Sequence, residues 1–194
     1  MRSALVALLT VSFLFTASLV PVRAFDGTPQ PGAEGGFSSE DLLDAGHDFF
    51  GEATSGLAVG LSHMLARFGP PDGYILGEEG SGAIVGGLRY GEGALQLYGQ
   101  APAPVFWQGP SFGWDFGGSA SRVMMLVYNM RSARELMQRY TGVDGSAYLV
   151  GGVSMTVMAA DDAFVVPVRT GVGARLGVSL GYLKFTSEPT WNPF

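Results

Sequence analysis

The chain has no cysteine, a single lysine at Lys184 and only two histidines among its 194 residues. The absence of cysteine excludes disulfides, thiolate metal sites and thiol nucleophiles together. Charged residues are also scarce, at 14% of the chain, and 11 Lys plus Arg against 17 Asp plus Glu give a net charge of −6. A nucleic-acid partner needs a clustered basic surface, so this composition argues against one.

Glycine and apolar residues are plentiful instead. The 30 glycines are about twice the average share, and 47% of the residues are hydrophobic. The glycines follow no period of three, so collagen is excluded, and the apolar content excludes a disordered tail. The glycines must therefore serve a packed fold, and the length suits one globular domain.

The first 24 residues have the pattern of an export signal. Arg2 precedes an apolar run over residues 4–20, and Val22 and Ala24 supply the small residues of a cleavage site. The run contains four Ser or Thr residues and is short for a membrane span. We therefore expect a cleavable signal peptide over residues 1–24, cut near Ala24, with a retained N-terminal anchor as the alternative.

Export determines the compartment that we expect. An exported chain without cysteine suits the bacterial periplasm, where folding without disulfides is common, and we expect a periplasmic protein. Cleavage removes two arginines and no acidic residue, so the net charge falls from −6 to −8. The mature protein is therefore acidic.

Two helices are expected at the start of the mature domain, after a flexible leader over residues 25–37 that is rich in glycine, proline and polar residues. Ser38 or Ser39 can cap the first helix, which runs to Phe50, and Asp41 stands in the capping-box position. Residues 38–194 then form one domain.

The second helix is predicted over residues 54–68. Its Gly56 and Gly60 lie four residues apart and form a face that allows a close approach to another backbone. We expect this face to pack on the last strand of the domain, where Gly177, Ser179 and Gly181 leave one side nearly bare.

Beyond Gly73 the hydrophobic pattern takes a period of two, and Gly, Pro, Asn and Asp separate the runs. The expected strands are residues 73–79, 82–90, 94–99, 105–107, 112–116, 123–128, 148–158, 164–169 and 174–185. A short helix over residues 132–140, capped by Ser132 with Glu135, interrupts them. We expect a mainly β, barrel-like antiparallel meander of about eight to ten strands with two or three packed helices.

Three details of this region carry structural predictions. The glycine pairs 86–87, 117–118 and 151–152 fall inside predicted strands, where they favour the bends of a closed barrel. The run over residues 123–127 does not alternate, which indicates a strand covered on both faces. Asp161 and Asp162 are typical of a hairpin turn.

Motifs for chemistry are weak. Ser111 stands in a G-x-S-x-G sequence, but a strand pattern follows it and both histidines precede it, so a turn is favoured over a hydrolase nucleophile. His47, His63 and the adjacent carboxylates lack metal-ligand spacing, and no dinucleotide or phosphate loop has the required context. We expect no catalytic residue, no metal and no cofactor.

Aromatic residues provide the candidate binding site. They crowd one part of the β region and could line a groove for an apolar ligand, although filling the barrel core is the competing explanation. The candidate ligand-binding residues are Tyr90, Trp107, Phe112, Trp114 and Tyr128.

With these residues assembled, the chain from about residue 38 to residue 194 resembles the periplasmic envelope integrity protein A family of alphaproteobacteria. The residues that carry this resemblance are GY (73–74), LGEE (76–79), GGLRYGEG (86–93), WQGPS (107–111), MMLVYN (124–129), GVDGSAY (142–148) and TWNPF (190–194). The resemblance implies a small β-barrel with a non-enzymatic role in maintaining the cell envelope.

A weaker similarity is to SYLF-type lipid-binding domains, over residues 86–93, 107–118 and 171–183. Some of those relatives bind acidic phosphoinositides, which an acidic chain with one lysine does not favour. We therefore expect a non-enzymatic periplasmic protein that binds a lipid-like or other envelope component. The alternatives are a protein scaffold in the periplasm and a hydrolase of envelope polymer that uses Ser111.

Overall fold

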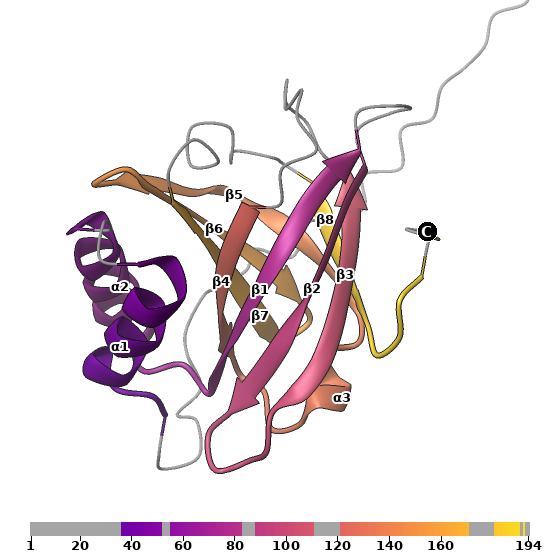
Figure 1. Ribbon diagram of the computed structural model, residues 1–194, viewed down its shortest axis with the longest axis horizontal. Helices are drawn as coiled ribbons and strands as arrows, with labels where there is room; N and C mark the ends of the chain where they lie inside the picture. Colours follow the sequence, from indigo (N-terminus) through magenta and orange to yellow (C-terminus); the bar gives the residue numbers. More distant parts are fainter. Residues whose placement is uncertain are drawn as a thin grey trace, which may run out of the picture.

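The computed structural model describes residues 36–51, 55–82, 88–110, 121–170, 181–190 and 192. The described strands form a closed antiparallel barrel, and two helices pack against its outside (Figure 1). The predicted fold class is confirmed. The strands are β1 (Gly73–Gly82), β2 (Leu88–Leu97), β3 (Ala103–Pro110), β4 (Ser121–Tyr128), β5 (Arg139–Val150), β6 (Val153–Ala160), β7 (Ala163–Thr170) and β8 (Tyr182–Thr186), and the helices are α1 (Ser39–Phe50), α2 (Ser55–Phe68) and α3 (Ala133–Leu136).

The strand order around the barrel is β1-β2-β3-β8-β5-β6-β7-β4. Two groups of consecutive hairpins, β1-β2-β3 and β5-β6-β7, agree with the predicted meander. The prediction of one continuous meander is wrong, because β4 pairs with β1 and β7 and β8 lies between β3 and β5. This pairing closes the barrel, and hydrophobic alternation alone does not specify which strands become neighbours.

Two predicted elements have different boundaries. Residues 148–158, expected as one strand, belong to β5 and β6, and the intervening Gly151 and Gly152 form a two-residue turn with φ of 59° and 81°. The helix expected over residues 132–140 is only the single turn α3, because β5 begins at Arg139. The predicted turn at Asp161 and Asp162 is confirmed between β6 and β7.

The start of α1 follows from its sequence. Ser38 Oγ accepts a hydrogen bond from Asp41 N at 3.2 Å, and Asp41 Oδ2 accepts one from Ser38 N at 2.9 Å, which is the predicted capping box. Phe37 N donates to Pro71 O at 3.0 Å, so the last residue of the predicted leader is fixed to the barrel. The predicted signal peptide over residues 1–24 lies outside the described residues.

The core has two parts that share β4. Val123, Met125 and Val127 point into the barrel, whereas Met124 and Leu126 point outward to the helices, and all five are fully buried. The prediction that this strand is covered on both faces is confirmed. Among the described residues, no helix combines the length and the apolar character that crossing a membrane requires.

The helices cover a different strand from the one predicted. A Cβ at Gly56 would collide with the carbonyl oxygen of Gly151, and one at Gly60 would lie 3.2 Å from Met155 Sδ, so this face of α2 packs on β6 and on the turn before it. Of the residues predicted to receive this face, Gly177 and Ser179 lie outside the described residues, and β8 lies between β3 and β5. The small residues of α2 therefore serve a close approach, but to another partner.

Candidate functional site

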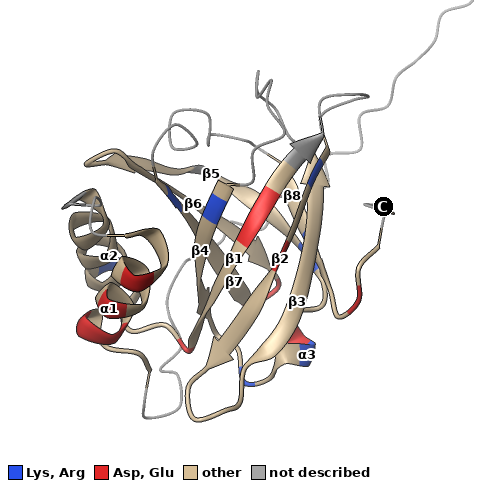
Figure 2. Cartoon of the chain, in the orientation of Figure 1, with Lys and Arg blue, Asp and Glu red and all other residues tan. Residues whose placement is uncertain are grey.

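The interior of the barrel is apolar at one end and charged at the other. Arg169 on β7 donates to Glu79 on β1, from Nε to Oε1 at 2.6 Å and from Nη2 to Oε2 at 3.2 Å. Arg89 Nε on β2 lies 3.8 Å from the same Oε2. Charged residues of β1, β2 and β4 gather toward the upper end of the barrel in Figure 2. No pattern in the sequence indicated this ionic cluster.

The arginines keep Glu79 ionised. Burial of the side chain, which is 7% exposed, would by itself raise the pKa of Glu79. The charges of Arg169 and Arg89, with hydrogen bonds from Arg169 and from Trp107 Nε1 at 3.4 Å, outweigh burial and hold this pKa below its ordinary value. The cluster is therefore a buried carboxylate between two guanidinium groups.

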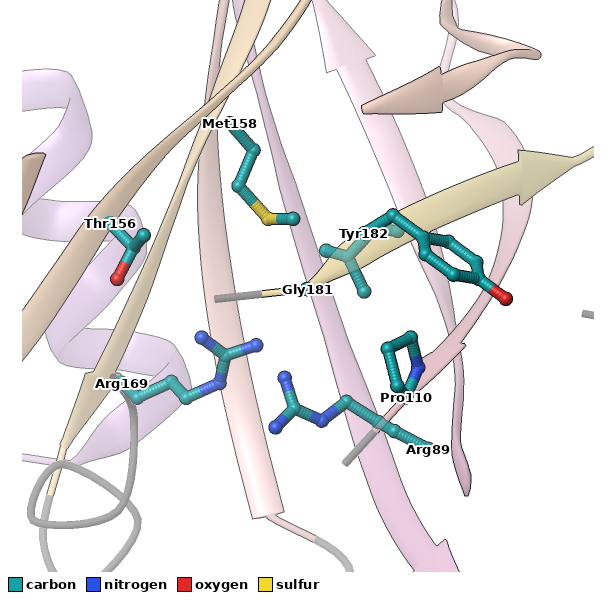
Figure 3. A pocket seen from close by; sticks show the side chains of 8 residues that line it. Arg89, Pro110, Thr156, Met158, Arg169, Gly181 and Tyr182 are labelled. Atoms are coloured by element: carbon teal, nitrogen blue, oxygen red, sulfur yellow. The ribbon is translucent and has the colours of Figure 1, made fainter. Parts of the chain in front are cut away.

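A small internal cavity lies beside this cluster. Its volume is about 10 Å³, which suits about one water molecule. The guanidinium groups of Arg89 and Arg169 point toward one another there, and Thr156, Met158 and Tyr182 complete the wall (Figure 3). A cavity of this size does not hold an organic ligand.

Trp107 lies inside the barrel next to the cluster. Its side chain is 0% exposed, and its indole packs against Gly77 and Gly91, where a Cβ would collide with the ring. Glycine at these two positions is therefore required by the indole. This bare patch in the wall is a physical reason for part of the high glycine content of the strands.

A larger pocket lies on the outer side of β1, β2 and β3. Its volume is about 340 Å³, within the usual range for ligand sites. Alternation along the strands places two rows of outward residues there: Glu78, Glu92 and Phe106 stand opposite one another, and so do Gly80, Tyr90 and Gln108. Pro189 and Thr190 of the C-terminal segment bound the pocket beyond β3. We call it the outer pocket.

The electrostatics of the outer pocket are acidic. Glu78 and Glu92 stand directly opposite each other on β1 and β2, and both are exposed. Arg122 on β4 reaches Glu78 at 3.9 Å, but both side chains are more than half exposed, so this ion pair is weak. The outer pocket thus favours a neutral or cationic ligand over an anionic one.

The structure separates the predicted site residues. Tyr90 and Trp107 both line the outer pocket, although the indole of Trp107 points into the barrel beneath it. Tyr128 lies away from both, beneath α2, where its ring stacks on Phe164 at 4.5 Å between centroids. Burial raises the pKa of Tyr128, and Asp72 adds to this increase. Residues 111–120, which include the predicted Phe112, Trp114 and Ser111, lie outside the described residues.

Sequence reasoning missed Gln108 and Glu92, which share the pocket with Tyr90 and Phe106. Their alternation with the inward-facing Trp107 and Gly91 was a usable signal, because residues two apart on a strand share a face. That pattern does not show which strands pair with each other. The pairing of β1 with β2 is what brings Glu78 to Glu92.

The described residues offer no metal centre. They contain no group of three His, Asp or Glu side chains arranged to hold an ion. His47 lies exposed on α1, and His63 lies exposed on α2, 5.2 Å from the ring of Tyr148.

Two comparisons with known proteins find relatives. Residues 35–194 match the sequence family described as Envelope integrity protein A. The crystal structure of a beta-barrel-like, uncharacterized protein from Brucella abortus is 53% identical and superposes with a TM-score of 0.77, covering 82% of this chain and 99% of that one. No curated protein matches the chain.

Proposed function

This chain belongs to the Envelope integrity protein A family, and from that premise we propose that it supports the cell envelope without catalysis, by binding an envelope component in the outer pocket. The observation that carries the proposal is the outer pocket itself, in which the half-buried rings of Tyr90 and Phe106 border a space of about 340 Å³. An exported, periplasmic protein is in the right place for this role.

The charge of the outer pocket limits the ligand. A lipid-like ligand is consistent with the aromatic lining and with the weak SYLF-type similarity, but the carboxylates of Glu78 and Glu92 repel an anionic headgroup. The ligand is therefore a neutral or cationic molecule with an apolar part. This feature distinguishes the proposed binding from that of acidic phosphoinositides.

Filling the outer pocket tests the proposal. A Cβ at Gly80 meets no atom within 4 Å, and Gly80 lines the pocket, so Gly80→Leu occupies the space without strain in the strand. We expect native mass spectrometry of the wild-type protein, purified gently from its own periplasm, to show a reproducible bound mass. Gly80→Leu should lose that mass while it keeps its melting temperature.

Ala94→Leu is the matched control. Ala94 is exposed on the same face of β2, and it does not line the outer pocket. This variant should keep the bound mass. A bare wild-type protein under all conditions would count against ligand binding and in favour of a protein scaffold. A mass that survives Gly80→Leu would count against the outer pocket as the binding site.

A further inference from the structure

We infer that the outer pocket binds an N-acetylated amino-sugar unit of a saccharide. The inference rests on the proposed function of the same pocket and adds the chemical class of the ligand. It combines three features of the lining: two aromatic rings, two opposed carboxylates, and a buried amide donor without an acceptor.

The aromatic rings supply the apolar contact. Tyr90 and Phe106 lie on neighbouring strands as a diagonal pair, two residues apart in the register, and both are half-buried at the outer pocket. Sugar rings present C–H groups on their faces, and these groups pack against aromatic faces. The same rings are too few to enclose a long acyl chain, which would extend into water beyond them.

The carboxylates can accept hydrogen bonds from a ligand. Like charges directly opposite on an antiparallel pair destabilise a sheet, and Glu78 and Glu92 occupy such a pair. An ionised carboxylate only accepts hydrogen bonds. Ligand hydroxyl and amide N–H groups satisfy both carboxylates, whereas a phosphate would add a third negative charge.

Gln108 requires an acceptor. Its side chain lines the outer pocket and is 1% exposed, and its Nε2 has no hydrogen-bond partner in the part of the chain that the structure describes. A buried donor without an acceptor is unfavourable. The torsion of a terminal amide is broad, so turning this donor toward a ligand oxygen in the outer pocket costs little.

An acetamido sugar meets these requirements together. Its amide N–H and ring hydroxyls donate to Glu78 and Glu92, its amide carbonyl accepts from Gln108 Nε2, and its methyl and C–H faces contact Tyr90 and Phe106. A simple ammonium ion would leave Gln108 Nε2 without an acceptor, and a hydrocarbon chain would offer no hydrogen bond to Gln108 or to the two carboxylates.

Calorimetric titration with triacetylchitotriose, an uncharged trimer of N-acetylglucosamine, tests the inference on the mature protein. We expect saturable binding, with maltotriose, which lacks the acetamido groups, binding at least about tenfold more weakly. Glu92→Gln keeps the side-chain shape and should weaken trimer binding about tenfold. Glu40→Gln, an exposed site on α1, should leave it unchanged.

The outcomes separate this inference from the proposed function. No saturable binding, equal binding of maltotriose, or an unchanged affinity for Glu92→Gln overturns the amino-sugar inference. If the native bound mass is still lost in Gly80→Leu, the proposed function stands with another ligand. Cleavage of the trimer would instead overturn the non-catalytic proposal. Acyl chains in the native mass would identify a lipid-linked saccharide, and their absence would identify a free glycan.

Discussion

Glu79 lies between the guanidinium groups of Arg89 and Arg169 inside the barrel. Removing its charge leaves buried positive charges uncompensated, so we expect Glu79→Gln to destabilise the protein by about 3 kcal/mol. The neighbouring Glu78 is 57% exposed, and Glu78→Gln should change stability by less than about 0.5 kcal/mol. Urea unfolding measures both. Equal free energies of unfolding for the two variants would show that the buried cluster does not stabilise the fold.

The same carboxylate predicts a pH dependence. The folded-state pKa of Glu79 is lower than the ordinary value of 4.5 expected for the unfolded chain. Its contribution to stability is therefore complete above the unfolded-state pKa and is lost as the pH falls through the folded-state pKa. As the pH is lowered from 6 through the folded-state pKa, the free energy of unfolding should fall more for the wild type than for Glu79→Gln. Parallel pH profiles would contradict this prediction.

Tyr128 gives a third test at the level of single residues. Its side chain is 2% exposed, and its hydroxyl has no hydrogen-bond partner in the described structure. Removing an unsatisfied buried hydroxyl is neutral or favourable, so Tyr128→Phe should leave the melting temperature unchanged or higher. It should also leave the native bound mass unchanged. Loss of that mass would instead support Tyr128 as a ligand-binding residue.

At the scale of elements, the contact of α2 with the β5–β6 turn determines how closely the helix approaches the barrel. A Cβ at Gly56 would overlap backbone atoms of Gly151, which cannot move without shifting the turn. At Gly60 the neighbour is the flexible end of Met155. We expect Gly56→Ala to lower stability by about 2 kcal/mol and Gly60→Ala by clearly less, measured by thermal unfolding. The reverse order would contradict the described packing.

Some features of the helices and strands follow from short stretches of the sequence. The capping box at Ser38, the turn at Asp161 and the burial of β4 on both faces all follow from short-range patterns, and the structure confirms each one. The partner of Gly56 and the neighbours of β8 depend on contacts between residues far apart in the chain, which no local pattern encodes.

In the whole molecule, short-range patterns likewise pointed to some residues of the candidate site but not to their arrangement. Aromatic crowding pointed to Tyr90 and Trp107, and barrel closure brings both to the outer pocket. The pattern could not show that Trp107 fills the interior while Tyr90 faces outward beside Glu92, because the inward direction depends on how the sheet closes. Tyr128 was grouped with them for the same reason, although it belongs to the helix-covered side.

We propose that this chain maintains the envelope through the outer pocket. The most direct measurement is the survival in detergent of cells that lack the chain and are complemented at equal protein level. Gly80→Leu, which fills the pocket where a Cβ meets no atom within 4 Å, should leave cells as sensitive as the deletion. Ala94→Leu should restore wild-type survival. Full rescue by Gly80→Leu would contradict the claim.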